Sequence, residues 1–93
     1  MNYSRFFMKK NTATKIQIGL AIREKMSEQG TTIAWLARQV NCDRGNLHKH
    51  LQKAHIYPEL LQKISIALKT DFFIHYSNHI RQAIENEESV VLI

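Results

Sequence analysis

Two runs of apolar residues at helical spacing, joined by a short polar turn, organise the stretch from Thr32 to Gln52 and the residues just after it. The first run has the spacing i, i+3, i+4 and i+7: Ile33, Leu36, Ala37 and Val40. The second has the spacing i, i+4 and i+7: Leu47, Leu51 and Ala54. Residues so spaced share one helix face. The pattern predicts two amphipathic helices, the first capped by Thr32 and the second, from about Asp43 to Lys53, capped by Asp43.

The opposite face of the second predicted helix is polar and basic. Its members point away from Leu47 and Leu51 on a helical wheel. They are Gly45, His48, Lys49 and Gln52, with Arg44 in the exposed first turn. Such a face is either simply solvated or the binding surface for a polar partner.

Three further helices are predicted around this pair. The first runs from about Lys15 to Gln29 and stops at Gly30. Its apolar positions are Ile18, Ile22 and Met26. The fourth starts at Pro58, which suits the first turn of a helix, with Glu59 favourable beside it. Its broad apolar face comprises Leu60, Leu61, Ile64, Ala67 and Leu68.

A fifth helix, capped by Thr70 or Asp71, is expected to run to about Asn86. Its apolar positions are Phe73, Tyr76, Ile80 and Ile84. The pattern as a whole predicts an all-α, compact five-helix domain over residues 15–86, between an N-terminal arm (1–14) and an apolar C-terminal tail (87–93).

Three features lie outside this helical pattern. The arm contains Arg5, Phe6, Phe7, Lys9 and Lys10 and no acid; it is a loose terminus, a DNA-contacting extension, or a segment docked through its aromatic residues.

Trp35 lies nearly opposite the apolar stripe of its helix, so the arm, a second subunit or a partner is expected to cover it. The tail ends in Val90, Val91, Leu92 and Ile93, which lie on their own domain, add a strand to another chain or enter a dimer groove.

Charge adds a partner class to this picture. The chain has 93 residues, enough for one domain with one modest core, and a formal net charge of +5. Residues 1–53 carry ten Lys or Arg against three acids, whereas residues 54–93 carry three against five. This basic excess favours nucleic acid or an anionic membrane surface. Membrane-surface helices keep large apolar groups on the lipid side, whereas the basic face here is short and polar, so we expect nucleic acid and no membrane.

The single cysteine, Cys42, rules out an internal disulfide and favours a reducing compartment, with intermolecular pairing as a conceivable redox switch. The chain has no apolar run of the length of a signal peptide or a membrane span. We therefore expect a cytoplasmic protein.

Metal binding and catalysis find little support. His75 and His79 form an H-x3-H pair, but no cysteine pair accompanies it as a structural zinc site requires. His50 is expected to be a partly buried packing residue and His48 an exposed donor. The three glycines form no phosphate-binding loop, and Cys42 has no nucleophile motif around it. We expect no metal, no cofactor and no enzymatic activity.

The segment from Ile16 to about Ile84 resembles the lambda-repressor-like (Cro/repressor, XRE) helix-turn-helix transcriptional regulators. Gly30 ends helix one, Thr32 caps helix two, Leu36-Ala37 corresponds to the family's Leu-Ala pair, and Leu47 to the central apolar residue of the recognition helix. The run LLQKISIALKTDFF is similar to the fourth helix and the start of the fifth in small bacterial and mobile-element members.

This chain departs from the family pattern at four positions. Ile33 replaces the usual Gln of helix two, Asn41 the turn Gly, and Cys42 the following Val. Asn tolerates the left-handed conformation, and Cys is a small apolar residue. Gly45 weakens the recognition helix by up to about 1 kcal/mol relative to Ala and allows close approach to DNA.

The residues and the resemblance lead to one expectation, a sequence-specific double-stranded DNA-binding transcriptional regulator. A helix in the major groove presents short or forked donors to base edges and cations to phosphates. Bases are expected to meet Arg44, Asn46, His48 and Lys49, and phosphates Thr32, Gln52 and Lys53. A homodimer is expected, because one domain reads too few base pairs. The alternatives are a protein-interaction module such as an antitoxin or adaptor, acting through Trp35 and the tail, and, with less support, RNA binding.

Overall fold

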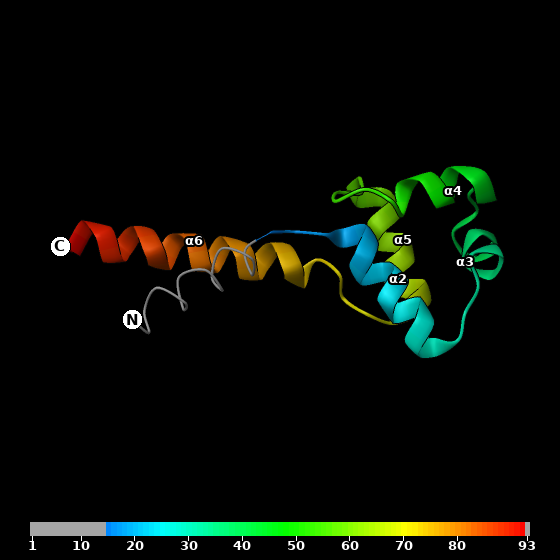
Figure 1. The fold of residues 1–93 in the computed structure, drawn as a ribbon, viewed down its shortest axis with the longest axis horizontal. Coiled ribbons are helices and arrows are strands. Elements are labelled where there is room, and N and C mark those ends of the chain that lie inside the picture. The colour runs from blue at the N-terminus through cyan, green and yellow to red at the C-terminus, as the bar shows by residue number, and fades with distance from the viewer. Residues whose placement is uncertain (1–14, 93) are drawn as a thin grey trace, which may run out of the picture.

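The structure, a computed structural model, describes residues 15–92 and the side chains of residues 15–87. This part of the chain forms five helices and no strand: α2 (Ile18–Gln29), α3 (Ile33–Val40), α4 (Arg44–His50), α5 (Pro58–Leu68) and α6 (Ile74–Leu92). The predicted all-α class is confirmed for these residues. Helices α2 to α5 and the turn after them, residues 18–73, are called the body here; α6 extends away from it (Figure 1).

One apolar core holds the body together, and α3 packs against both α4 and α5. The core residues come from every helix of the body: Ile18, Ile22, Met26, Leu36, Ala37, Val40, Leu47, Leu51, Ile56, Leu60, Leu61, Ile64, Leu68 and Phe72. The apolar faces predicted for helices one to four are therefore confirmed, with Ile33, Ala54 and Ala67 only partly buried. Ile56 and Phe72 are core residues that the helical spacing did not identify.

The ends of α2, α3 and α4 follow the predicted capping pattern. The Thr32 hydroxyl accepts a hydrogen bond from the backbone N–H of Trp35 at 3.1 Å, and the Asp43 carboxylate accepts one from that of Asn46 at 3.1 Å. Gly30 ends α2 with φ 71° and Asn41 ends α3 with φ 55°. These bonds and left-handed turns satisfy backbone groups that a helix end leaves unpaired, so the sequence fixes where α3 and α4 begin.

The start of α2 is set by contact with a distant loop. The backbone N–H groups of Ile18 and Gly19 donate to the carbonyls of Ala54 at 2.9 Å and Lys53 at 3.0 Å. A Cβ atom on Gly19 would overlap the carbonyl oxygens of Leu51 and Lys53. Because these bonds take the place of another helical turn, α2 begins at Ile18, not at about Lys15 as predicted.

Helix α4 is shorter than predicted and ends at His50 instead of about Lys53. The Nε of Arg23, on α2, donates to the Leu51 carbonyl at 3.0 Å. The N–H groups of Gln52 and Lys53 donate to carbonyls three residues earlier, at 3.2 and 3.1 Å. The last carbonyls of α4 are thus bonded within this tight turn, which carries Gln52 and Lys53, and Arg23 of α2 binds the carbonyl of Leu51, the residue just after the helix.

The residues before α6 do not cap it as predicted. The Thr70 hydroxyl donates back to the Leu68 carbonyl at 2.9 Å, and the Asp71 carboxylate accepts from the Phe73 N–H at 2.9 Å, closing a turn before Ile74. This turn directs Phe72 into the core, where it is 2% exposed, while Phe73 is only partly buried.

Helix α6 differs most from its prediction. It runs to Leu92 and not to about Asn86, because no Gly or Pro interrupts residues 74–92 and Glu favours helix. Of the four apolar positions predicted for this helix, Phe73 and Tyr76 pack against the core, whereas Ile80 and Ile84 are 56% and 51% exposed. No helix in the described residues is long and apolar enough to cross a bilayer.

Two further expectations concern the termini and Trp35. Val90, Val91 and Leu92 lie on the last turns of α6, so their backbone is helical, not extended; their side chains, Ile93 and the arm residues lie outside the described part of the chain. Trp35 is partly buried against the core. Because α3 is short and packs against both α4 and α5, the core also contacts Trp35, which lies outside the apolar stripe of this helix.

Candidate nucleic-acid interface

The outward face of α4 is set by one buried anchor. Leu47 is fully buried, and Leu51, just after the helix, is 2% exposed. With this side held in the core, the other side chains of α4, except the partly buried His50, are exposed to solvent. All eight predicted contact residues are exposed: Thr32, Arg44, Gly45, Asn46, His48, Lys49, Gln52 and Lys53. The helix therefore presents a mixed cationic and amide surface.

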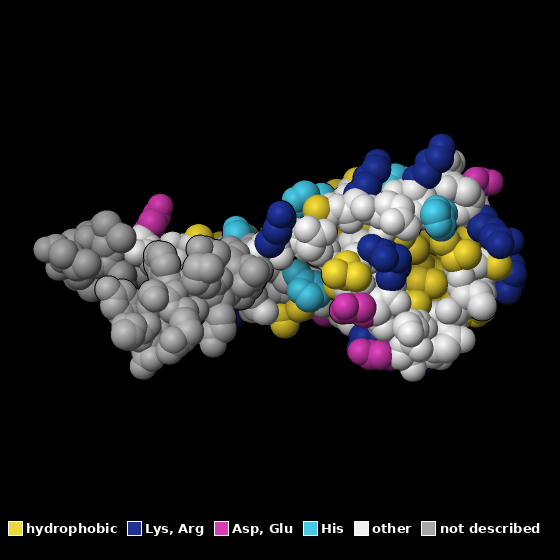
Figure 2. All heavy atoms as spheres, viewed as in Figure 1, with side chains coloured by type: hydrophobic (Ala, Val, Ile, Leu, Met, Phe, Trp, Pro, Cys, Tyr) yellow, Lys and Arg dark blue, Asp and Glu magenta, His cyan; other side chains and the backbone are white. Residues whose placement is uncertain are grey.

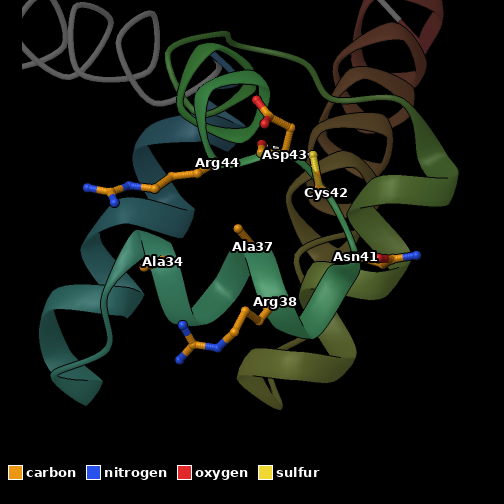
Figure 3. Close-up of a pocket in the computed structure, with 7 residues that line it drawn as sticks. All are labelled: Ala34, Ala37, Arg38, Asn41, Cys42, Asp43 and Arg44. Carbon is orange, nitrogen blue, oxygen red and sulfur yellow. Dashed lines mark hydrogen bonds between the residues drawn. The ribbon is translucent and has the colours of Figure 1, made fainter.

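The cations of this surface have no close carboxylate partner among the described residues, in which the only ion pair joins Lys25 and Glu28 of α2 at 3.0 Å. The one acid nearby, Asp43, turns its carboxylate back over the start of α4 (Figure 3). Arg44 extends away from Asp43 in the same view. Arg44, Lys49 and Lys53 can therefore pair with an anion without first breaking a salt bridge.

A shallow groove separates α3 from the start of α4. Its lining residues are Ala34, Ala37, Arg38, Asn41, Cys42, Asp43 and Arg44. The guanidinium groups of Arg38 and Arg44 extend to the same side of this groove (Figure 3). Arg38 was not among the predicted contacts. The sequence could have identified Arg38, because it lies one helical turn after Ala34 on a side of the helix away from the core positions.

A second groove brings the start of α3 beside α4. It is lined by Arg23, Met26, Ser27, Thr31, Ile33, His48, Leu51 and Gln52. Ile33, where the family resemblance leads one to expect Gln, therefore contributes apolar surface next to His48. Arg23 belongs to this groove and also binds the Leu51 carbonyl, so it positions the end of α4. Sequence spacing alone did not identify that role.

The histidines divide between packing and surface positions. His50 is partly buried and its ring meets that of Tyr57 edge-on, with centroids 5.6 Å apart, as expected for a packing residue. His48, His75 and His79 are exposed. Among the described side chains, no group of three or more His, Cys, Asp or Glu residues is arranged to hold a metal ion. Cys42 is partly buried, with its Sγ 3.5 Å from the Asp43 carbonyl.

The loop after α4 is tied to the start of α6. His55 Nδ1 and the Tyr76 hydroxyl share a hydrogen bond of 2.7 Å, and their rings are stacked with centroids 5.7 Å apart. Burial raises the pKa of the Tyr76 hydroxyl above its ordinary value of 10.0. This contact joins α6 to the chain that leaves α4.

Positive charge gathers at the end of the molecule that carries α3 and α4. Residues 15–53 contain seven Lys or Arg and three acids, whereas residues 74–87 of α6 contain one Arg and two Glu. In the view of Figure 2, Lys and Arg side chains project around the α3 and α4 end, opposite the end of α6. A polyanion would therefore be attracted to the α4 end of the molecule.

Comparisons of the chain with known protein families, with curated proteins and with solved structures found no match.

Proposed function

We propose that this protein is a sequence-specific, double-stranded DNA-binding transcriptional regulator that inserts α4 into the major groove. The observation that carries this proposal is the outward face of α4, a helix anchored through Leu47. This face presents amide groups and cations that have no carboxylate partner among the described residues. The α3–turn–α4 unit (residues 33–50) then serves as the helix-turn-helix. Its resemblance to the lambda-repressor-like regulators supports the same assignment.

The side chains of this face suit the division between base edges and phosphates. Arg donates two hydrogen bonds to guanine, at O6 and N7, whereas Asn donates one to adenine N7 and accepts one from its N6 amino group. Arg44 and Asn46 are therefore assigned to bases, with His48 and Lys49 beside them. Gly45 leaves room for close approach, because it is exposed and, among the described residues, a Cβ there would meet only the Asp43 carboxylate, at 3.2 Å.

Phosphate contacts are assigned to the residues around this reading surface. Gln52 and Lys53 follow α4 in an exposed turn. Arg38, on α3, lines the same groove as Arg44, on α4. The Thr32 oxygen accepts a bond from the backbone, yet its own proton remains available to donate to a phosphate oxygen. Such contacts set position and affinity but do not read sequence.

The regulator is proposed to bind as a homodimer at two half-sites. A single α4 contacts only a few base pairs, so one copy offers limited specificity. In two-fold complexes the half-site centres are about 34 Å apart or a multiple of that distance. This part of the proposal fails if sedimentation shows a monomer both free and on its selected DNA.

Selection of bound fragments from genomic DNA tests the proposal, followed by affinity measurements on the enriched duplex at several salt concentrations. We expect one enriched motif and a binding constant that falls steeply with salt. Lys53→Ala should weaken all duplexes alike, whereas Lys49→Ala should relax sequence preference by about 1 to 3 kcal/mol. Salt-insensitive binding, or no binding to any duplex, would contradict the proposal.

A second candidate is a protein-interaction module, such as an antitoxin or adaptor. The half-exposed Ile80 and Ile84 of α6 favour it, because an apolar helix face commonly marks a contact surface. Affinity capture with and without nuclease separates the two candidates. A partner that stays bound after nuclease treatment supports the interaction module, and one that is lost supports DNA binding.

A further inference from the structure

Helix α6 carries an apolar stripe that the body covers only in part. Phe73 and Tyr76 begin the stripe and pack against the core. Ile80 and Ile84 continue it at the same helical spacing, four residues apart, and remain 56% and 51% exposed. The stripe thus passes without a break from the core onto the projecting part of α6. A one-sided apolar helix of this kind normally buries that side against another element.

The charges beside the stripe are unevenly distributed along α6. The first half of the helix contains His75, His79 and Arg81, and the second half contains Glu85 and Glu87, all of them exposed. A parallel, in-register pair of such helices would bring the glutamates of both copies together. An antiparallel pair would instead place the glutamates of each copy beside Arg81 and the histidines of the other.

The same charges argue against other partners for this face. Anionic lipid and nucleic acid would both be repelled by the acidic second half of α6. A second copy of this chain has both the apolar stripe and the complementary charges. A two-fold axis that crosses the stripe near Ile80 and Ile84 brings these residues of the two copies together, as in an isologous dimer.

We infer that α6 is the self-association surface of this protein, and that two copies pair their α6 helices antiparallel through Ile80 and Ile84. Arg81 of each copy lies beside Glu85 of the other. The two bodies then occupy opposite ends of the paired helices, and α4 of each remains free. This contact supplies the dimer that two-fold DNA binding requires, yet it exists without DNA, so the two proposals can fail separately.

Sedimentation velocity of the free full-length chain over a range of concentrations tests the inference. Wild type should shift from monomer to dimer as concentration rises. Ile80→Glu and Ile84→Glu should each raise the dimer dissociation constant about 100-fold, because each change enters the interface twice and each lost contact costs about tenfold. Both side chains are exposed, so circular dichroism and melting temperature of the monomer should stay unchanged.

Ile66→Glu is the matched control. Ile66 lies on α5 and is 74% exposed, so the same chemical change there should leave association unchanged. The inference is overturned if wild type is monomeric at every concentration, if the α6 variants associate like wild type, or if Ile66→Glu weakens association equally. A monomer whose melting temperature falls with Ile80→Glu would also overturn it, because the chain itself would then cover the stripe.

Charge reversal tests the antiparallel orientation. Arg81→Glu and Glu85→Arg should each weaken the dimer, and the double variant should recover wild-type association, because it restores opposite charges across the pair. A double variant as weak as either single variant would overturn the antiparallel arrangement. High salt should reduce the difference between single and double variants, since these charges are exposed.

Discussion

The body and α6 carry apolar residues at the same helical spacing, yet they bury them to very different degrees. In the body, Ile64 is fully buried; on α6, Ile84 is 51% exposed. The difference comes from the surroundings, because α2 to α5 cover one another whereas α6 extends away from them (Figure 1) and, of its residues, Tyr76 packs against the core. Periodicity therefore identifies which side of a helix is apolar, and tertiary arrangement decides whether that side forms a core or a contact surface.

The largest expected effect compares one substitution in both regions. Ile64→Ala should lower the free energy of unfolding by about 2 to 5 kcal/mol, because it opens a cavity in the core. Ile84→Ala should change it by less than about 0.5 kcal/mol, as for a surface site. Urea denaturation, at a protein concentration too low for self-association, measures both. Equal losses would mean that α6 is as well packed as the body.

A second comparison lies within the body and uses two glycines. Gly19→Ala should destabilise the protein by about 1 to 3 kcal/mol, because the added Cβ overlaps the Leu51 and Lys53 carbonyls and forces the loop to move. Gly45→Ala, on the exposed face of α4, should be neutral or stabilising by up to about 1 kcal/mol, since Ala favours helix. Thermal melts of the two variants check this, and similar losses in both would contradict the close approach at Gly19.

The end of α4 gives a smaller effect. Arg23→Ala should cost about 1 kcal/mol, because it removes the charged donor at the Leu51 carbonyl. Lys25→Ala is the control on the same helix and should cost less than about 0.5 kcal/mol, the range for an exposed ion pair. Arg23→Ala should also accelerate amide hydrogen exchange at Leu51 to Lys53. Unchanged exchange there would show that Arg23 does not hold this turn.

The smallest effect concerns the junction between the body and α6. Burial raises the Tyr76 pKa, so the unfolded chain ionises first as the pH passes the ordinary value of 10.0. The stabilising contribution of neutral Tyr76 is therefore complete below that pH and is lost as the pH rises through the folded-state pKa. Tyr76→Phe should reduce this alkaline loss of stability, and Tyr57→Phe should not. An identical pH profile for wild type and Tyr76→Phe would contradict the effect.

The sequence predicted the parts of this structure that depend on local interactions. Thr32, Asp43, Gly30 and Asn41 set helix ends through their own side chains or backbone conformations, and their roles are confirmed. The buried anchor Leu47 follows from spacing alone. With that anchor on the inside, the solvent exposure of the candidate site on α4 could also be predicted.

The remaining features depend on contacts between distant segments. Gly19 and Arg23 act on the loop after α4, about thirty residues later in the chain, which spacing along one helix cannot show. The choice of Phe72 over Phe73 for the core follows from the turn closed by Asp71. The direction of α6 decides that Ile80 is exposed, and no local signal in the sequence reports that direction.

The central claim is that α4 reads DNA sequence, and the affinity ratio between a selected duplex and a scrambled duplex tests it most directly. Wild type, Arg44→Ala and Lys63→Ala should be compared at fixed salt. Lys63, on α5, is also exposed, so it controls for the loss of one positive charge. We predict that Arg44→Ala reduces the ratio about 5- to 150-fold, the loss of one bidentate base contact, and that Lys63→Ala leaves it unchanged. An equal ratio for all three proteins would contradict the claim.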